Sequence, residues 1–221
     1  MPIDLPRRIV AEAIGTAGLL IAIVGSGIMG ERLAGGNVAI ALLANSLATG
    51  GALFALIATL QPISGAHLNP VVTLADALSG GVAWGAVPVV VVAQIAGGVA
   101  GVLVAHVMFG EAWVSWSAND RGGSALVVSE AVATFGLLAV ILGCARDRPE
   151  AIPAAVGAYI VAAYWCTSST SFANPAVTLA RALTGTFAGI RTADVPSFVA
   201  AQLAGAITAA ALIRWLLPKS R

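Results

Sequence analysis

Two related heptapeptides determine the fold that we expect: NPVVTLA at residues 69–75 and NPAVTLA at residues 174–180. Asparagine is a preferred helix N-cap, because its side-chain oxygen accepts hydrogen bonds from the first free backbone N–H groups. Proline suits the next position, where no intrahelical donor is lost and φ is already helical. Each heptapeptide therefore predicts the start of an apolar helix, and the paired motif consists of Asn69, Pro70, Val71, Asn174, Pro175 and Ala176.

The segments around these heptapeptides are typical of a membrane protein. A helix needs about 20 mostly apolar residues to cross a bilayer, and six runs qualify: 9–29, 38–60, 83–109, 125–145, 151–170 and 195–217. The stretches that begin with Asn-Pro, 69–80 and 174–187, are too short to cross alone. Only 10% of the residues are charged and 59% are hydrophobic, whereas a soluble domain carries about 25% charged residues. We predict an all-α membrane protein with one domain over residues 1–221.

The chain repeats itself, with repeat 1 over about 5–110 and repeat 2 over about 123–218. The sequence AEA at 11–13 resembles SEA at 129–131, and AQIAG at 93–97 resembles AQLAG at 201–205. Each half contains three long spans, which is an odd number, so the halves enter the bilayer from opposite sides as inverted repeats. We therefore predict six transmembrane helices and two re-entrant half-helices that meet near the midplane.

The basic residues predict the orientation of these spans. One side of the predicted bundle carries Arg7, Arg8, Arg146, Arg148, Lys219 and Arg221, with Arg214 nearby, and the other carries Arg32, Arg121, Arg181 and Arg191. The side with more basic residues normally faces the cytoplasm. We expect a multi-pass protein of the inner (plasma) membrane with both termini in the cytoplasm.

Two facing helix N-termini have chemical consequences for anything that passes between them. Each N-terminus carries about half a positive charge, which repels cations and protons. The capping amides of Asn69 and Asn174 are expected to keep a free NH₂ donor for a passing solute. The arrangement therefore favours a pore for uncharged polar molecules that excludes protons.

The sequence as a whole resembles the aquaporins, or major intrinsic proteins. SGAHLNP at 64–70 is similar to the first family signature and NPA at 174–176 to the second, and the similarity covers nearly the whole chain. The resemblance implies a right-handed bundle of six tilted helices with two half-helices, one pore per subunit and a homotetramer. The pattern is most similar to bacterial aquaporins associated with arsenic resistance.

The resemblance also implies a narrow filter, and here the sequence departs from the family. Aquaporins normally have Arg directly after the second NPA, where this chain has Val177. A count without gaps places the other filter residues at Thr49, Ala162 and Ser171. Loss of Arg removes bulk, charge and five donors. We expect a wider filter that passes water, glycerol, urea or neutral metalloid hydroxides such as arsenite by passive diffusion. The alternatives are a water-selective aquaporin and, from another class, a secondary transporter.

Several charged or polar residues admit two interpretations. Arg181 follows Val177 by one helical turn, so it either provides charge in the vestibule, opposite Asp76 at the other mouth, or snorkels to the interface. Glu12 and Glu130 are intramembrane carboxylates, a pattern that indicates either a proton relay or acceptors for loop amides. The resemblance favours the second role, with Gln94, Gln202 and His67 also holding the loops.

The remaining residues indicate neither catalysis nor a cofactor. The sequence contains no nucleophile with a plausible base, and its two histidines are too far apart in the sequence to indicate a metal site. His106, near a span end, is expected at the interface. A net charge of +1 gives no reason to expect a nucleic acid partner, so the expected partners are small neutral solutes and the lipid bilayer. Cys144 and Cys166 are expected as free thiols packed between helices, and Trp165 has no assigned role.

Overall fold

The computed structural model describes residues 3–217, and that part of the chain is helical without strands. The long helices are α1 (Leu5–Leu33), α2 (Val38–Ser64), α4 (Val87–Phe109), α5 (Ser124–Asp147), α6 (Ile152–Cys166) and α8 (Val195–Leu216). The two short helices are α3 (Pro70–Ser79) and α7 (Pro175–Arg181), and three 3₁₀ turns lie at Trp84–Ala86, Pro149–Ala151 and Thr192–Asp194. The predicted six long helices and two half-helices are confirmed. Lys219 and Arg221 lie outside the described residues.

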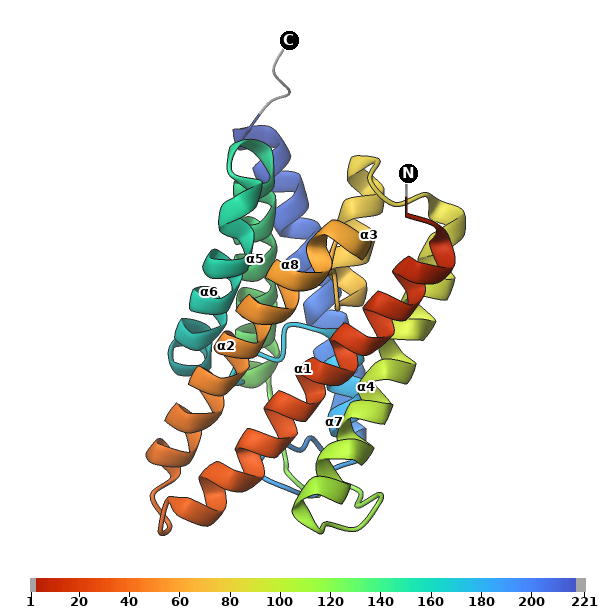
Figure 1. The fold of residues 1–221 in the computed structure, drawn as a ribbon. Helices are drawn as coiled ribbons and strands as arrows, with labels where there is room; N and C mark the ends of the chain where they lie inside the picture. The colour runs from red at the N-terminus through yellow and green to blue at the C-terminus, as the bar shows by residue number, and fades with distance from the viewer. Residues whose placement is uncertain (1–2, 218–221) are drawn as a thin grey trace.

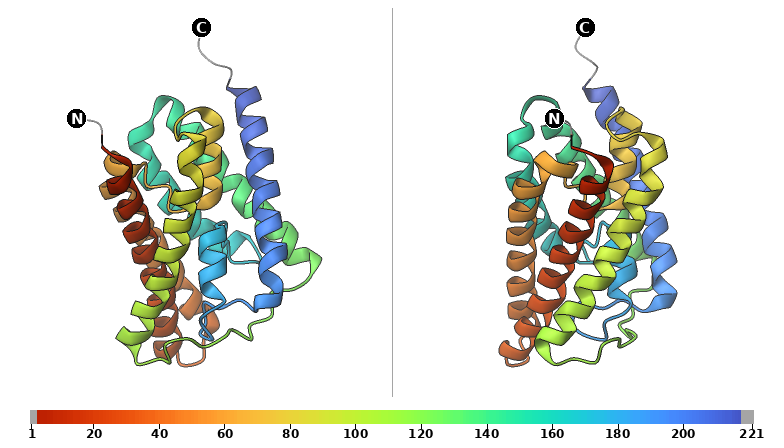
Figure 2. Two further views of the ribbon diagram at one scale, coloured as in Figure 1. Left: turned by 90° about the vertical axis from the view of Figure 1, so that its right-hand side faces the viewer. Right: turned by 45° about the vertical axis from the view of Figure 1, so that its right-hand side comes forward.

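The two halves pack in the same way. Helix α1 packs against α4 and α2, as α5 packs against α8 and α6, and the contact between α2 and α6 joins the halves. Both ends of the chain lie at the same end of the bundle, from which α1 leads away and toward which α5 returns (Figure 1). The half-helices α3 and α7 lie inside the bundle, from opposite ends, as the turned views show (Figure 2). The predicted inverted arrangement is therefore present.

Glycines permit the closest helix contacts. A Cβ atom at Gly97 of α4 would collide with the backbone carbonyl oxygen of Ala13 in α1, and one at Gly205 of α8 would collide with that of Ala131 in α5. The two glycines hold equivalent places in the repeats. Small residues at such positions let helix backbones approach where lipid supplies no hydrophobic drive.

The fifth predicted span is shorter than expected. Within residues 3–217, five helical segments are long and apolar enough to cross a membrane by length and composition, whereas α6 has 15 residues and ends at Cys166 instead of near residue 170. The chain then leaves the helix because Thr167 is extended and the following residues form the loop that leads to α7. Helix α7 likewise ends at Arg181, well before the predicted residue 187.

The structure shows the surroundings of Trp165 and Cys166 at the end of α6. The Trp165 indole N–H donates to the Ser46 hydroxyl of α2 at 3.2 Å, which joins the two halves of the chain. Both cysteines are free, as predicted, although Cys166 is exposed and not packed between helices.

Candidate pore and its lining

The N-termini of α3 and α7 face each other, and their capping asparagines are cross-linked. Asn69 accepts from the Val71 amide at 3.1 Å, and Asn174 accepts from the amides of Ala176 at 3.0 Å and Val177 at 3.3 Å. Each side-chain NH₂ also donates to the loop before the other half-helix, at 2.8 Å from Asn69 to the Ala173 carbonyl and at 2.7 Å from Asn174 to that of Leu68.

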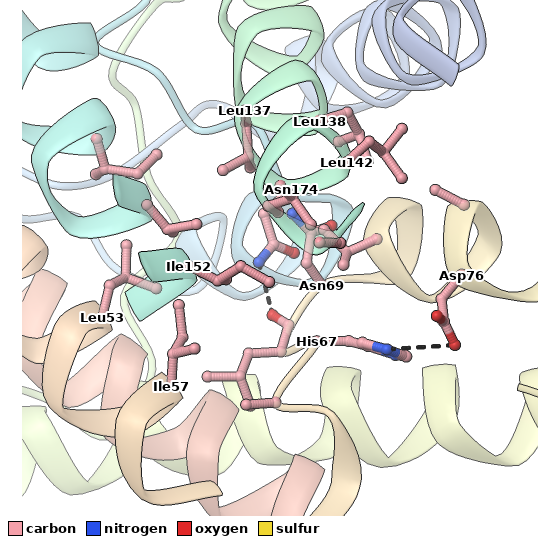
Figure 3. Close-up of a pocket in the computed structure, with 18 of the residues that line it drawn as sticks. Leu53, Ile57, His67, Asn69, Asp76, Leu137, Leu138, Leu142, Ile152 and Asn174 are labelled. Atoms are coloured by element: carbon pink, nitrogen blue, oxygen red, sulfur yellow. Dashed lines mark hydrogen bonds and ion pairs between the residues drawn. The ribbon is translucent and has the colours of Figure 1, made fainter. Parts of the chain in front are cut away.

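These cross-links correct the expectation that both amide NH₂ groups are free. An amide nitrogen carries two N–H donors, and the structure commits one of them at each asparagine. One donor per asparagine is left for a solute. Asn69 and Asn174 lie side by side in the wall of a cavity of about 840 Å³ (Figure 3).

The cavity has an apolar wall and a polar one. Side chains from α2, α5 and α6 form the apolar wall, among them Leu53, Ile57, Leu137, Leu138, Leu142 and Ile152 (Figure 3). The polar wall comes from the two loops and the asparagines of the half-helices. A small molecule in this cavity therefore meets hydrogen-bonding groups on one side and hydrocarbon on the other.

Glu12 holds the loop that leads to α3. Its carboxylate accepts hydrogen bonds from the Ser64 hydroxyl at 2.6 Å and from the backbone amides of His67 at 2.9 Å and Leu68 at 2.7 Å. The Gln94 side-chain NH₂ donates to it at 2.8 Å and also to the Thr73 hydroxyl at 2.9 Å. Glu12 is 1% exposed, and its carboxylate thus joins the loop before α3 to Gln94 of α4 inside the bundle.

Glu130 repeats the arrangement in the second half. It accepts from the Ser169 hydroxyl at 3.0 Å and from the amides of Phe172 at 3.0 Å and Ala173 at 2.9 Å. Gln202 donates to it at 2.5 Å and to the Thr178 hydroxyl at 2.8 Å. Of the two interpretations of the buried glutamates, these contacts agree with acceptors for loop amides.

Both loops contain residues in the left-handed region of backbone space. Ala66 (φ 48°) and Leu68 (φ 50°) precede α3, and Ser171 (φ 53°) and Ala173 (φ 49°) hold the equivalent places before α7. Such conformations cost about 1–3 kcal/mol each in residues other than glycine and persist only where surrounding contacts fix them. The hydrogen bonds to the two glutamates supply those contacts.

The residues proposed for the filter do not all lie in the cavity wall. Thr49, Ser171 and Val177 line the cavity, but Ala162 is exposed on the outside of α6 and does not. Tyr164 lines the cavity in its place, with its hydroxyl 3.2 Å from that of Thr49. Ala162, at the position given by the count without gaps, thus lies outside the cavity wall. Tyr164 is two residues further along α6, and two residues turn a helix by about 200°, onto its opposite face.

Arg181 lies in the cavity wall and not at the lipid interface. Arg181 is 2% exposed, and its guanidinium carbon lies 3.4 Å from the centre of the Phe172 ring. Its Nε donates to the Ala188 carbonyl. We call the end of the cavity near Arg181 the far mouth, since it lies away from the chain termini.

His67 and Asp76 lie toward the other end of the cavity, which we call the terminal mouth. The His67 side chain points at Asp76, with 3.6 Å between its Nε2 and the carboxylate (Figure 3). Its Nδ1 lies 3.2 Å from the Thr73 hydroxyl. Arg146 and Arg214 also line this mouth. His67 thus holds its loop through its backbone amide, while its ring faces the cavity.

Arg121 and His106 have structural roles that the sequence did not indicate, although neither lines the cavity. Arg121, in the loop after α4, donates to the carbonyls of Gly189 at 2.9 Å and Ser169 at 3.2 Å, and burial lowers the pKa of its guanidinium. His106 is fully buried, not interfacial. Its Nδ1 lies 3.0 Å from the Trp113 carbonyl and its Nε2 lies 2.8 Å from the Thr184 hydroxyl. No motif marks either residue, because their partners lie in irregular loops.

The chain is similar to known proteins over nearly all its length. A family model described as "Major intrinsic protein" matches residues 2–162 and 147–221. The chain is 53% identical over 218 residues to "Aquaglyceroporin AqpS" of Rhizobium meliloti (strain 1021), covering 99% of this chain and 93% of that protein. It is 32% identical over 196 residues to "Aquaporin NIP1-3" of Oryza sativa subsp. japonica, covering 85% of this chain and 68% of that protein.

A solved structure shares the fold. The X-ray structure of the aquaglyceroporin from Plasmodium falciparum matches with a TM-score of 0.80, covering 97% of this chain and 98% of that chain. The sequence identity is 21%, so this similarity concerns the fold alone.

Proposed function

Since the chain belongs to the major intrinsic protein family, we propose that its cavity is a transmembrane channel for the passive diffusion of water and small neutral solutes. The observation that carries the proposal is the placement of Asn69 and Asn174 side by side in the cavity wall, each capping a half-helix. The remaining N–H of each asparagine is a donor for an oxygen atom of a passing solute.

Exclusion of protons follows from the same placement. The N-terminal ends of α3 and α7 bring positive potential to the junction, which opposes a cation or a hydronium ion. A water molecule that accepts from both asparagines has its hydrogens turned away from them, which interrupts a proton-conducting chain. The Glu12 and Glu130 carboxylates are engaged by loop donors, which supports a structural role for them and not a proton relay.

The solute class is proposed from the filter. Val177 replaces a bulky arginine with a small apolar side chain, and Ser171, Thr49 and Tyr164 add hydroxyl groups to the cavity wall. This combination suits solutes that carry several hydroxyl groups on a small body. We propose glycerol and neutral metalloid hydroxides such as arsenite, and the similarity to a protein named an aquaglyceroporin supports the first.

Assembly and orientation form a further part of the proposal. The chain is proposed to sit in the inner membrane with both termini in the cytoplasm, because Arg7, Arg8, Arg146 and Arg148 lie toward the end where the termini are and basic residues favour that side. The family resemblance implies a homotetramer. The terminal mouth, with Asp76 and His67 in its wall, would then be the cytoplasmic vestibule.

A coupling experiment separates the channel from its alternatives. Proteoliposomes containing the full chain are loaded with buffer, and glycerol uptake is followed with and without an imposed proton gradient. A channel gives uptake that is linear in glycerol concentration and indifferent to the gradient. Uptake that saturates and follows the gradient would establish a secondary transporter, and water flux without glycerol uptake would establish a water-selective pore.

A further inference from the structure

We propose that Arg181 is a specificity-determining residue of this channel: its guanidinium supplies, one helical turn beyond Val177, the positive charge and hydrogen-bond donors that exclude cations and bind the oxygen atoms of hydroxylated solutes. The inference rests on the proposed channel function. It concerns a position that has no part in either Asn-Pro motif.

The placement of Arg181 exposes its charge to the pore. The side chain is buried from bulk solvent and lines the cavity. Among residues 3–217, no carboxylate lies within 4.0 Å of its guanidinium nitrogens. By contrast, Arg191 at the same end of the molecule is paired with Asp120 and Asp194. An uncompensated charge in a wall of low dielectric constant acts strongly on any ion in the pore.

The guanidinium is held so that part of it stays available. Phe172 packs against it in a cation–π contact of 3.4 Å, and the Phe172 ring is itself fixed by an edge contact with Phe198, 5.3 Å between ring centres. Hydrogen bonding within the described chain uses Nε alone, toward Ala188. The two terminal nitrogens, which carry four N–H groups, are therefore left for a solute or for water.

A second polar group in the cavity wall also lacks a partner. The Ser171 hydroxyl oxygen is buried, and no residue in the described part of the chain hydrogen bonds to it. Buried polar atoms are nearly always satisfied, so an unpaired hydroxyl in a pore wall indicates a place where solute or water binds. Ser171 directly precedes Phe172, the residue on which Arg181 is stacked. Ser171 and Arg181 line the same cavity, so a passing molecule meets both a free hydroxyl and a cationic donor group.

This arrangement differs in effect from an arginine at position 177. An arginine there would extend into the cavity from the first turn of α7, since Val177 lines the cavity. Arg181 comes from the last turn and its side chain is drawn against Phe172. The charge is retained at the far mouth, while Val177 leaves more room in the cavity than an arginine at that position would. Such a filter combines rejection of cations with room for a molecule larger than water.

The test compares three substitutions of Arg181 in proteoliposomes with one matched control. Arg181→Met keeps most of the length and removes the charge, Arg181→Gln removes the charge but keeps an amide donor, and Arg181→Lys keeps the charge and loses the stacked plane. Arg191→Met removes a charge from the same end of the molecule without touching the cavity wall. The measurements are methylammonium uptake at a pH where it is a cation, and the ratio of glycerol to water permeability.

We expect Arg181→Met and Arg181→Gln to raise methylammonium uptake by about tenfold or more, since each removes the repelling charge. Arg181→Lys and Arg191→Met should exclude methylammonium as the wild type does. The glycerol-to-water ratio should change in all three Arg181 variants, because each loses donors, and not in Arg191→Met. Because Lys also keeps a cation beside the Phe172 ring, the melting temperature of each variant is measured as well. A merely structural role would make the cation leak follow the loss of stability, whereas exclusion by charge would make it follow the charge alone.

Two results would contradict the proposal in distinguishable ways. If the wild type conducts water and glycerol and the Arg181 variants match it in both measurements, the inference is wrong and the channel function stands. If wild-type vesicles are as impermeable as empty ones, the channel function is wrong and the inference falls with it. If Arg181→Lys and Arg181→Gln let methylammonium in equally fast, the charge of Arg181 does not exclude cations and the residue only holds the loop that contains Phe172.

Discussion

Asn69 and Asn174 each donate a side-chain N–H to the carbonyl that precedes the other, to Ala173 at 2.8 Å and to Leu68 at 2.7 Å. Each asparagine therefore caps its own half-helix and ties down the opposite loop. The junction at the centre of the bundle is a single hydrogen-bonded unit, and the two halves of the chain position each other's pore-lining groups.

Replacement of Asn174 by alanine should weaken this unit. The Asn174→Ala variant loses the cap of α7 and the bond to the Leu68 carbonyl, so the melting temperature in detergent should fall, by an amount corresponding to about 1–3 kcal/mol. Asn37→Ala is a matched control, because Asn37 caps α2 by accepting from Ala39 and Ile40 and makes no cross-link. An Asn174→Ala variant that is no less stable than Asn37→Ala would count against the cross-link.

The buried glutamates should not tolerate a neutral amide. In Glu130→Gln, one oxygen is replaced by an NH₂ group that faces the donors of Ala173 and Gln202, and two buried donors lose their acceptor. We expect a loss of about 2–5 kcal/mol of stability, measured as a lower melting temperature and a lower yield of monodisperse protein. Glu31→Gln, at an exposed position, should behave as the wild type. A stable Glu130→Gln protein that has lost proton-dependent uptake would instead indicate a relay.

Glycine at position 97 should be irreplaceable for packing. A methyl group there meets the Ala13 carbonyl, which is backbone and cannot move aside, so Gly97→Ala should destabilise the bundle by about 1–3 kcal/mol. Gly51→Ala is the control, since nothing lies within 4 Å of a Cβ atom at Gly51, and alanine favours a helix by up to about 1 kcal/mol over glycine. Melting temperatures that fall equally in both variants would contradict the packing role of Gly97.

Added bulk at position 177 should select against larger solutes. Val177→Phe places a ring in the cavity wall, and we expect glycerol permeability to fall by about tenfold or more while water permeability falls less. Leu179→Phe puts the same ring on the same helix at an exposed residue outside the cavity and should leave both permeabilities unchanged. Unaltered glycerol entry in Val177→Phe would remove Val177 from the filter.

The two candidate positions on α6 can be separated directly. Ala162 faces outward, so Ala162→Leu should leave glycerol and water permeability at wild-type values in stopped-flow measurements. Tyr164→Phe removes the hydroxyl that lies 3.2 Å from the Thr49 hydroxyl and should shift the glycerol-to-water ratio. A shift in Ala162→Leu and none in Tyr164→Phe would reverse our assignment.

The architecture was predictable because its signals are repeated in the sequence. The six long helices and the two half-helices were predicted correctly from apolar run lengths and the two Asn-Pro heptapeptides, and the family from the resemblance of residues 64–70 and 174–176 to its signatures. The groups that hold the loops also repeat in the sequence. In each half they are a glutamate, a glutamine and a threonine: Glu12, Gln94 and Thr73 in the first half and Glu130, Gln202 and Thr178 in the second. The threonines were missed, although they lie within the heptapeptides.

What the sequence could not give depends on helix rotation and loop conformation. The candidate filter residue on α6 was counted along a segment without a motif, and a difference of two residues exchanges the cavity face of the helix for its outer face. The cross-links of Asn69 and Asn174 require left-handed residues such as Leu68 and Ala173, which are not glycine and so carry no conformational signal. The sequence does not show that Arg181 stacks on Phe172, because this contact depends on the conformation of the loop that carries the ring.

The most direct test of the channel itself is stopped-flow light scattering on proteoliposomes of the full chain, which compares the entry of water, glycerol and arsenite with that into empty liposomes while a trapped dye reports internal pH. We predict fast water entry, glycerol or arsenite entry well above the empty vesicles, and no proton leak. Water entry without solute entry would contradict the wide filter, and rapid dissipation of a pH gradient would contradict proton exclusion at Asn69 and Asn174.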